Sequence, residues 1–418
     1  MNRVTSQVKN EAPAPVARHV ATAVLGALQI LAWGSTFYLP AVFAGAIVRD
    51  TGWRYDQVVA GLSLGLLVAG LVSPRVGRAI GQRGGRPVLA LGALLLALGL
   101  AVIGSAPNLA CYFAGWAVVG VGMGAGLYDA AFATLGRIYG KQARAAISGV
   151  TLLGGFASTV CWPFSAFLVE HFGWRAGCFV YAAIYLVVAV PLYLFVLPRN
   201  GAPIDSLDAS PAAAARDAVT AADLPVFAIL ASVLTMGAAI LSMMGTHLVT
   251  LMQARGLDLT AAVALGMLIG PAAVTARFVE TLAGSHYHPI WTMTASVGLV
   301  ALGACLFLTD NSLFAIAIIL YASGNGIGSI AKGTLPLALF GPERYPALVG
   351  RLALPIMVAM ALAPYLGAVA FERGGAQWTF LLLLALALSN VALVAVLWRL
   401  SRRPHVQNVE SDPVERRQ

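Results

Sequence analysis

The sequence predicts an all-α integral membrane protein of about twelve transmembrane helices, arranged as two bundles of six. Three observations lead to this fold class: charge is scarce, apolar runs are long, and the second half of the chain repeats features of the first. Of the 418 residues, 59% are hydrophobic and 10% are charged, whereas about 25% of the residues of a soluble globular protein are charged. So few charged residues do not cover a water-soluble surface of this size.

The apolar runs have the length of a membrane-crossing helix. Runs such as 88–106 and 381–397 approach the ~20 residues that cross a hydrocarbon core of ~30 Å at ~1.5 Å per residue. Only helices and closed barrels satisfy the backbone in lipid, and these runs lack the polar–apolar alternation of barrel strands. We therefore expect helices near residues 20–46, 57–77, 88–106, 109–136, 147–169, 177–197, 224–252, 260–283, 291–308, 312–340, 347–371 and 377–398.

Lys and Arg are distributed unevenly between the predicted loops. With the N-terminus inside, the cytoplasmic segments hold 20 of the 26 basic residues, the outer loops hold 5, and Lys332 lies within a span. Since cytoplasmic loops carry an excess of basic residues, we expect both termini in the cytoplasm and a multi-pass protein of a bacterial inner membrane. This topology explains the net charge of +9 without a nucleic-acid partner, and we expect a monomer surrounded by lipid.

The chain divides into two halves at its longest internal polar stretch. We expect a cytoplasmic tail at 1–19, which is too polar for a cleavable signal peptide, and a cytoplasmic tail at 399–418. Between them lie an N-terminal bundle at 20–197, a cytoplasmic linker at 198–223 and a C-terminal bundle at 224–398. Three residues of the first half recur after 201 positions, which favours a parallel duplication of six helices. They are Gly140, Gly149 and Pro163, matched by Gly341, Gly350 and Pro364.

The segment after the second predicted span reads GRAIGQRGGR over residues 77–86. It is similar to the cytoplasmic signature of the major facilitator superfamily, a Gly-x3-Asp-(Arg/Lys)-x-Gly-(Arg/Lys)-(Arg/Lys) loop. Gly81 stands where that family has Asp, so the ion pair of that Asp does not carry over. The alternative is a plain basic cytoplasmic loop. The resemblance implies a gating loop whose candidate residues are Gly77, Arg78, Gly84 and Arg86.

Within the superfamily, the chain resembles the bacterial monocarboxylate-porter-like branch. The Thr-Gly-Trp-Arg run at 51–54 follows the first span, and residues 139–149 are similar to the Tyr-rich and basic entry to the fifth span. Segments 127–132 and 333–337 also resemble bacterial exporters of trivalent arsenicals. The branch often pairs an Asp with an Arg four residues later in span eight. Arg277 fits the Arg, but Ala273 occupies the Asp position, so we assign Arg277 and Glu280 to the gating candidates.

Two ionisable residues fall inside predicted spans, where burying a charge is costly. Asp129 lies eight residues before Arg137, and Lys332 lies nine residues before Gly341. These spacings place both ~12–13 Å along their helices, a few Å on the cytoplasmic side of the midplane. The resemblance implies that spans one, four, seven and ten line a cavity, so the two residues would face each other.

Three interpretations of this pair stay open. The first is a salt bridge between the halves, which offsets part of the burial penalty. The second makes Lys332 the anchor of an anionic substrate and Asp129 the proton carrier. In the third, the two charges face cavity water independently.

Other polar and aromatic residues inside spans are candidates for the cavity wall. Close helix packing is an equally good explanation for those of span one, and a packing histidine is the alternative to a proton relay. The candidates are Gln29, Trp33, Thr36, Tyr38, Tyr128, Trp162, His247 and Asn325.

The resemblance implies a secondary active transporter that moves a small solute by alternating access. Proton coupling and a small organic anion are the first expectation, since Lys332 is cationic, and efflux of a toxic metalloid or drug-like compound is the alternative. An intramembrane enzyme is the other class, but no G-x-S-x-G or H-E-x-x-H motif is present. The four cysteines lack C-x-x-C spacing, and we expect neither a metal nor a cofactor.

The charge distribution makes a prediction about topology. Reporters that are active only in the cytoplasm, fused after Gln418 or inserted within residues 198–223, are expected to be active at both sites. A reporter signal from the periplasm at either site contradicts the arrangement of two six-helix bundles.

Overall fold

The computed structural model describes residues 15–197, 223–283 and 287–401, and these ranges contain helices and no strands. The predicted linker lies outside the described residues except for Asp223, as do most of the two predicted tails. The first half comprises α1 (Pro15–Gly34), α2 (Leu39–Thr51), α3 (Tyr55–Arg83), α4 (Gly85–Ser105), α5 (Leu109–Gly126), α6 (Tyr128–Tyr139), α7 (Ala143–Gly154), α8 (Ala157–Ile184) and α9 (Val190–Phe195). The second half comprises α11 (Leu224–Ala254), α12 (Leu259–Gly266), α13 (Ile269–Ala283), α14 (Pro289–Leu306) and α15 (Phe314–Ser401).

The described ranges contain nine helical runs that are long and apolar enough to cross a membrane. Two of the nine are interrupted by glycines with left-handed backbone. Gly173 divides the run Ala143–Phe195 into two segments, and Gly341 and Gly375 divide the run Asn311–Ser401 into three, which brings the nine runs to twelve spans. These glycines fall between the predicted spans, so the all-α, twelve-helix prediction is confirmed.

Glycines with positive φ recur at matching places in the two halves. Gly140 has a φ of 54° and Gly341 has a φ of 75°, and these two residues are 201 positions apart. Gly173 and Gly375 have φ values of 78° and 68°. An L side chain is strained in this region of the backbone, whereas glycine is not. Turns of the same kind therefore connect corresponding spans of the two halves, as a duplication requires.

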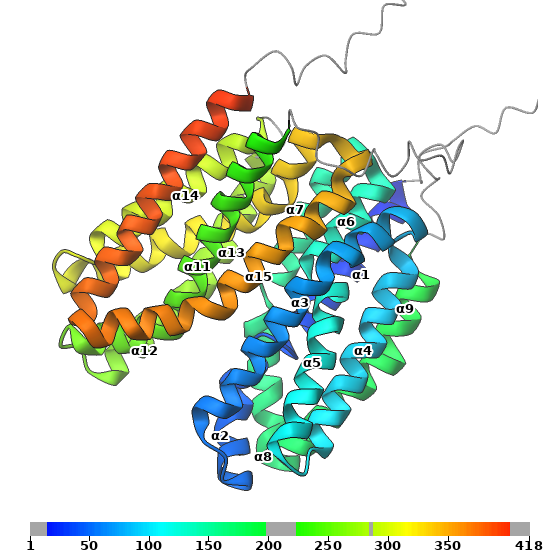
Figure 1. The fold of residues 1–418 in the computed structure, drawn as a ribbon, viewed down its shortest axis with the longest axis horizontal. Coiled ribbons are helices and arrows are strands. Elements are labelled where there is room, and N and C mark those ends of the chain that lie inside the picture. Colours follow the sequence, from blue (N-terminus) through cyan, green and yellow to red (C-terminus); the bar gives the residue numbers. More distant parts are fainter. Residues whose placement is uncertain (1–14, 198–222, 284–286, 402–418) are drawn as a thin grey trace, which may run out of the picture.

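Figure 1 shows the two halves as two lobes that meet at one end and diverge at the other. We call these ends the closed end and the open end. At the closed end, α3 and α6 of the first half pack on α15 of the second half. At the open end, α2 packs chiefly on α3 and α8 of its own half. The described molecule is therefore held together across its halves near one end.

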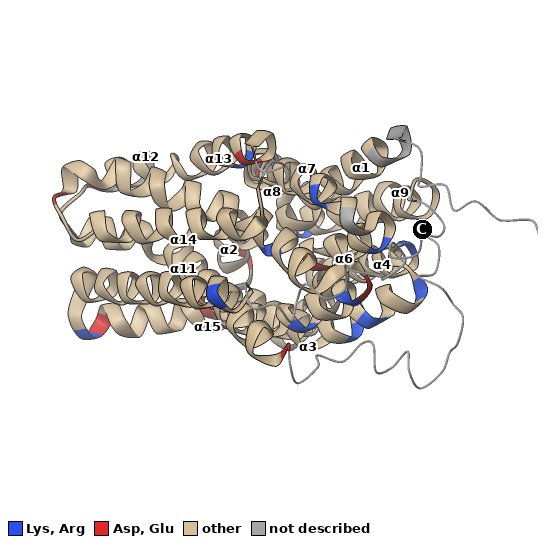
Figure 2. Ribbon diagram, turned by 90° about the horizontal axis from the view of Figure 1, so that it is seen from above, with Lys and Arg blue, Asp and Glu red and all other residues tan. Residues whose placement is uncertain are grey.

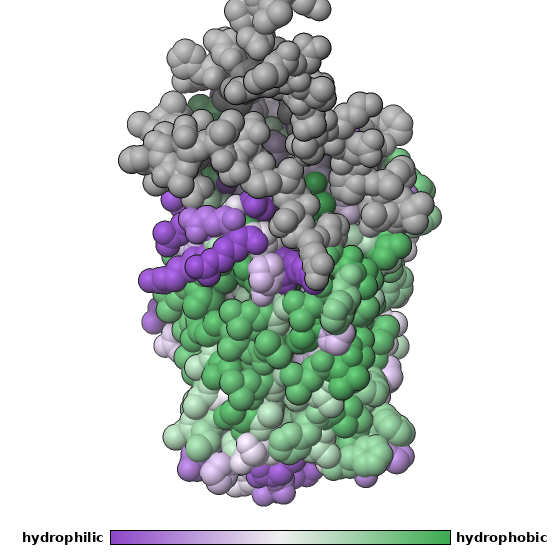
Figure 3. All heavy atoms as spheres, turned by 90° about the vertical axis from the view of Figure 1, so that its right-hand side faces the viewer, coloured by the Kyte–Doolittle hydropathy of each residue, from purple (hydrophilic) through white to green (hydrophobic). Residues whose placement is uncertain are grey.

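The surface is organised as expected for a membrane protein. Figure 3 shows a broad hydrophobic belt between two more hydrophilic bands. Figure 2 shows Lys and Arg residues over α3, α4, α6 and α7 of the first half. An apolar belt of this kind faces lipid acyl chains, and the multi-pass membrane prediction is confirmed.

The loop predicted over residues 77–86 is a helix for most of its length. α3 continues to Arg83, six residues past the predicted end of its span, and only Gly84, with a φ of 85°, interrupts the chain before α4. Arg78 is exposed on α3, and Arg86 lies in the first turn of α4. The signature therefore marks a one-residue break between two helices, and residues 77–83 before it contain no Pro.

Small residues allow the two halves to touch at the closed end. A Cβ atom on Gly77 of α3 would overlap the carbonyl oxygen of Pro346 and would lie 3.0 Å from Cα of Gly350. A Cβ atom on Gly350 would lie 2.5 Å from the carbonyl oxygen of Ser73. Backbones approach this closely only where side chains are missing. Gly77 is thus a contact between the halves rather than part of a mobile loop.

This contact makes a prediction about closure. In a cysteine-free background carrying Ser73→Cys, Gly77→Leu is expected to increase labelling of that cysteine by N-ethylmaleimide, because the leucine forces α3 away from α15. Ser73 is buried, so labelling is expected to be slow without the substitution. Gly245→Leu is the matched control, since nothing lies within 4 Å of a Cβ atom there. Equal labelling of the three proteins by the maleimide contradicts the prediction.

Candidate functional site

An ion pair joins the two halves in the interior. Lys332 Nζ lies 2.8 Å from Oδ1 of Asp129 and 3.1 Å from Oδ2. The Asp129 side chain is 8% exposed and the Lys332 side chain is 21% exposed, so each charge has lost most of its hydration. An attractive partner is what makes such burial tolerable. The structure therefore brings together Asp129 and Lys332, which the sequence analysis expected at similar depth on facing spans.

A break in span four positions the carboxylate. α5 ends at Gly126, and Leu127 has an extended backbone (φ −79°, ψ −173°) before α6 starts at Tyr128. Asp129 therefore lies in the first turn of α6, where the positive end of the helix dipole favours a negative charge. The break leaves the carbonyl of Gly126 without a helical partner, and Gln29 Nε2 donates to it at 2.7 Å. Gln29 thus supports the break.

Toward the closed end, the ion pair is covered by residues of both halves. The Tyr345 hydroxyl donates to the carbonyl oxygen of Gly333 at 2.5 Å, and its ring lies against Gly136 of α6. Gly333 itself packs against Phe132 and Ile147 of the first half. All of these side chains are buried. Among the residues that the structure describes, these buried side chains therefore pack between Asp129–Lys332 and the closed end.

Arg277 lies on α13, inside the predicted span 260–283. Its Nε donates to Ser329 Oγ at 3.0 Å and to the Gly326 carbonyl at 3.2 Å, both on α15. A Cβ atom on Gly155 of the first half would overlap Nη1 of Arg277. The guanidinium therefore reaches across the interface between the halves, and no carboxylate of the described residues pairs with it.

An aromatic cluster lines the first-half side of this region. Trp33 lies 5.2 Å from Tyr128 and 6.5 Å from Tyr38, measured between ring centroids. Trp162 lies 5.9 Å from Tyr38, and Phe132 stacks on Tyr128 at 5.2 Å. The Trp33 indole N–H is buried and finds no acceptor among the described residues.

The remaining cavity candidates bond within their own halves. Thr36, in the turn after α1, donates to the carbonyl of Ala32 near the end of α1. His247 Nε2 lies 2.8 Å from the carbonyl oxygen of Pro364. Asn325 donates to the Tyr321 carbonyl at 3.1 Å. These bonds fit the packing alternative, and nothing in the structure joins these three residues to the ion pair.

Glu280 lies in a buried network near the closed end. Thr292 donates to it at 2.7 Å, Tyr287 donates to its other oxygen, and Arg144 Nη2 lies 3.9 Å away. Burial and the bond to Glu280 raise the pKa of Tyr287 to about 12, so this phenol keeps its proton. Arg144 of α7 also donates to the Tyr287 carbonyl. The network therefore links the first half to the second half, as expected of a gate.

The profile of the Major Facilitator Superfamily matches residues 24–285 and again residues 272–417. The chain belongs to the Major Facilitator Superfamily. Its function is accordingly membrane transport rather than enzymatic catalysis. The matches do not distinguish the monocarboxylate-porter-like branch from the arsenical-exporter-like one, and a search of curated proteins finds no match.

Several solved structures of superfamily members share the fold. The match to the human organic anion transporter MFSD10 (TETRAN) covers 91% of this chain and 100% of that chain, with a TM-score of 0.69 and 17% sequence identity. FucP in the outward conformation covers 93%, with a TM-score of 0.75 and 14% identity, over 100% of its chain. The proton:xylose symporter XylE covers 95%, with a TM-score of 0.67 and 11% identity, over 98% of its chain. At these identities the likeness shows the fold alone.

Sequence reasoning about this superfamily member missed Ser329, Gly155, Tyr345 and Arg144. Each acts through contacts between spans that are far apart along the chain, so no local pattern marks them. The burial of Arg277 could be predicted from the sequence, because Arg277 lies six residues before the end of the predicted span 260–283. That depth alone indicates a buried arginine rather than a loop arginine.

The ion pair makes a prediction about stability. Asp129→Asn and Lys332→Ala each leave one buried charge without a partner, which costs roughly 3–5 kcal/mol in a buried pair. Each single variant is expected to lower the thermal unfolding temperature of the purified protein. The double variant removes both charges, so its unfolding temperature is expected to exceed that of either single variant. Strictly additive losses in this double-mutant cycle would falsify the energetic coupling.

Proposed function

We propose that this protein is a secondary active transporter of small organic anions, coupled to protons, in a bacterial inner membrane. The observation that carries the proposal is the charge of the interior. Asp129 neutralises Lys332, whereas Arg277 meets only neutral partners among the described residues. A buried cation without a counter-charge attracts an anion strongly because the surroundings have a low dielectric constant. An anionic substrate would complete this site.

The distribution of basic residues supports an assignment of the two ends. Basic residues of the first half such as Arg78, Arg83 and Arg86 lie at the closed end, where α3 meets α15 and α4 begins, and cytoplasmic surfaces carry the excess of positive charge. We therefore assign the closed end to the cytoplasm and the described state to the outward-facing one. The structural similarity to FucP in an outward conformation supports the same assignment.

Arg277 and Lys332 suggest two successive positions for the anion. Arg277 binds Ser329, and Lys332 follows three residues later on α15, which places it about 4.5 Å closer to the closed end. In this scheme the anion first binds Arg277. A proton then neutralises Asp129, the ion pair breaks, and Lys332 becomes available to the anion as the closed end opens.

This scheme couples one proton to one anion without net movement of charge. After the anion leaves, Asp129 loses its proton and pairs with Lys332 again, which restores the outward-facing state. The same cycle run backwards exports the anion. Proton symporters share this fold, and one solved structure with the fold is an organic anion transporter.

The alternative that the sequence left open is efflux of a toxic metalloid or a drug-like compound, and no observation favours it. For a metalloid, the described residues contain no cluster of three or more His, Cys, Asp or Glu side chains that could hold a metal ion. The organic anion is therefore the substrate class that we carry forward.

The proposal predicts that Arg277 is required for uptake of anions. In proteoliposomes with an inward proton gradient, Arg277→Gln is expected to lower kcat/KM for labelled benzoate by roughly 10- to 100-fold, because a bond to a charged group contributes about 1.5–3 kcal/mol. Arg277→Lys is expected to recover part of this loss. A protonophore is expected to abolish accumulation by the wild-type protein.

Arg54→Gln is the matched control for this experiment, because Arg54 pairs with Asp56 on the exposed surface. It is expected to transport benzoate as the wild-type protein does. Uptake that persists in Arg277→Gln, or accumulation that survives the protonophore, contradicts the proposed function.

A further inference from the structure

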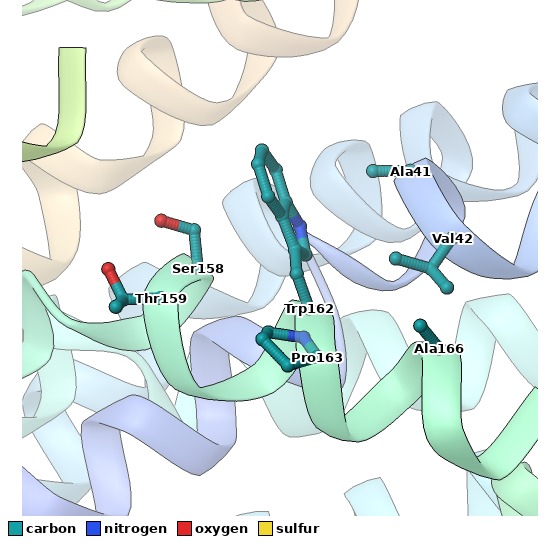
Figure 4. Close-up of a pocket in the computed structure, with 7 residues that line it drawn as sticks. All are labelled: Ala41, Val42, Ser158, Thr159, Trp162, Pro163 and Ala166. Carbon is teal, nitrogen blue, oxygen red and sulfur yellow. The ribbon is translucent and has the colours of Figure 1, made fainter. Parts of the chain in front are cut away.

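An apolar pocket lies between α2 and α8, on the open-end side of the aromatic cluster. Its volume is about 480 Å³. Figure 4 shows the Trp162 ring standing between Ser158 and Thr159 on one side and Ala41 and Val42 on the other. Pro163 and Ala166 complete its lining. Apart from the two hydroxyl groups and the indole N–H, the wall offers only hydrocarbon to a ligand.

The pocket begins where Arg277 touches the first half. Arg277 lies against Gly155, and Ser158, Thr159 and Trp162 follow three, four and seven residues later. Residues at these intervals share one face of a helix. Gly155 and Phe156 keep backbone angles close to helical between α7 and α8, so this face continues from Arg277 into the pocket over roughly 10 Å.

Trp162 is partly exposed at the pocket. Its side chain is 44% exposed, although it contacts Tyr38 of the aromatic cluster. An exposed indole beside a concave apolar wall is typical of a ligand pocket.

We propose that this pocket is a second subsite, which holds the apolar body of the transported anion while its charged group lies at Arg277. The substrates are then amphiphilic anions, such as carboxylates with an aryl or branched aliphatic group roughly 5–10 Å long, rather than small hydrophilic acids. This inference rests on the proposed function for the anionic end and adds the apolar end.

The experiment compares uptake of two labelled carboxylates in proteoliposomes, acetate and 4-phenylbutyrate. The wild-type protein is expected to have a KM for 4-phenylbutyrate at least about 10-fold below that for acetate, because the phenyl group leaves water in the pocket. Ala41→Phe fills the pocket from α2, where Ala41 is exposed, and is expected to reduce this KM ratio about 10-fold. Trp162→Ala is expected to change the ratio in the same direction.

Ala110→Phe is the matched control, since Ala110 is an exposed residue of α5 outside the pocket, and it is expected to keep the wild-type ratio. An unchanged KM ratio in both Ala41→Phe and Trp162→Ala overturns the second subsite and leaves the proposed function standing.

Competition by the neutral 4-phenylbutyramide separates the pocket from the proposal that the substrate is an anion. If the amide competes as well as the acid and Ala41→Phe weakens it, the pocket stands and the anion proposal fails.

Discussion

The ion pair between Asp129 and Lys332 is the interaction on which the described arrangement depends. It joins the two halves through opposite charges 2.8 Å apart in the interior, and removing either residue leaves the other charge buried without its partner. The close backbone contact of Gly77 with Gly350 lets α3 and α15 come together on the same side of the molecule. Helix breaks, small residues and tyrosine packing thus all serve to bring one carboxylate to one ammonium group.

The fold was accessible from sequence because its main determinants are local. Span length follows from hydropathy, and Gly173, Gly341 and Gly375 lie at the turns where the apolar runs are interrupted. The depths of Asp129 and Lys332 followed from counting residues along a helix of fixed rise. The continuation of α3 through residues 77–83 did not follow, because a family signature was taken for a loop although the segment has no helix breaker.

The candidate site was only partly accessible for the same physical reason. The extended backbone at Leu127 is set by Gln29, which bonds to the carbonyl that the break leaves open, and this contact joins two separate spans. The environment of Arg277 depends on Ser329 and Gly155, which lie on two further spans. Interior charge, apolar pocket and aromatic cluster meet only in three dimensions, and together they favour an amphiphilic anion.

The most direct test of this account is the distance between the two halves at the open end. Spin labels at Tyr55 and Gln253, both exposed, report this distance by double electron–electron resonance in a cysteine-free background. The account predicts one long distance for the protein with an intact ion pair, and a new shorter population in both Asp129→Asn and Lys332→Ala. Distance distributions that are the same in all three proteins would contradict a role of the ion pair in holding the outward-facing state.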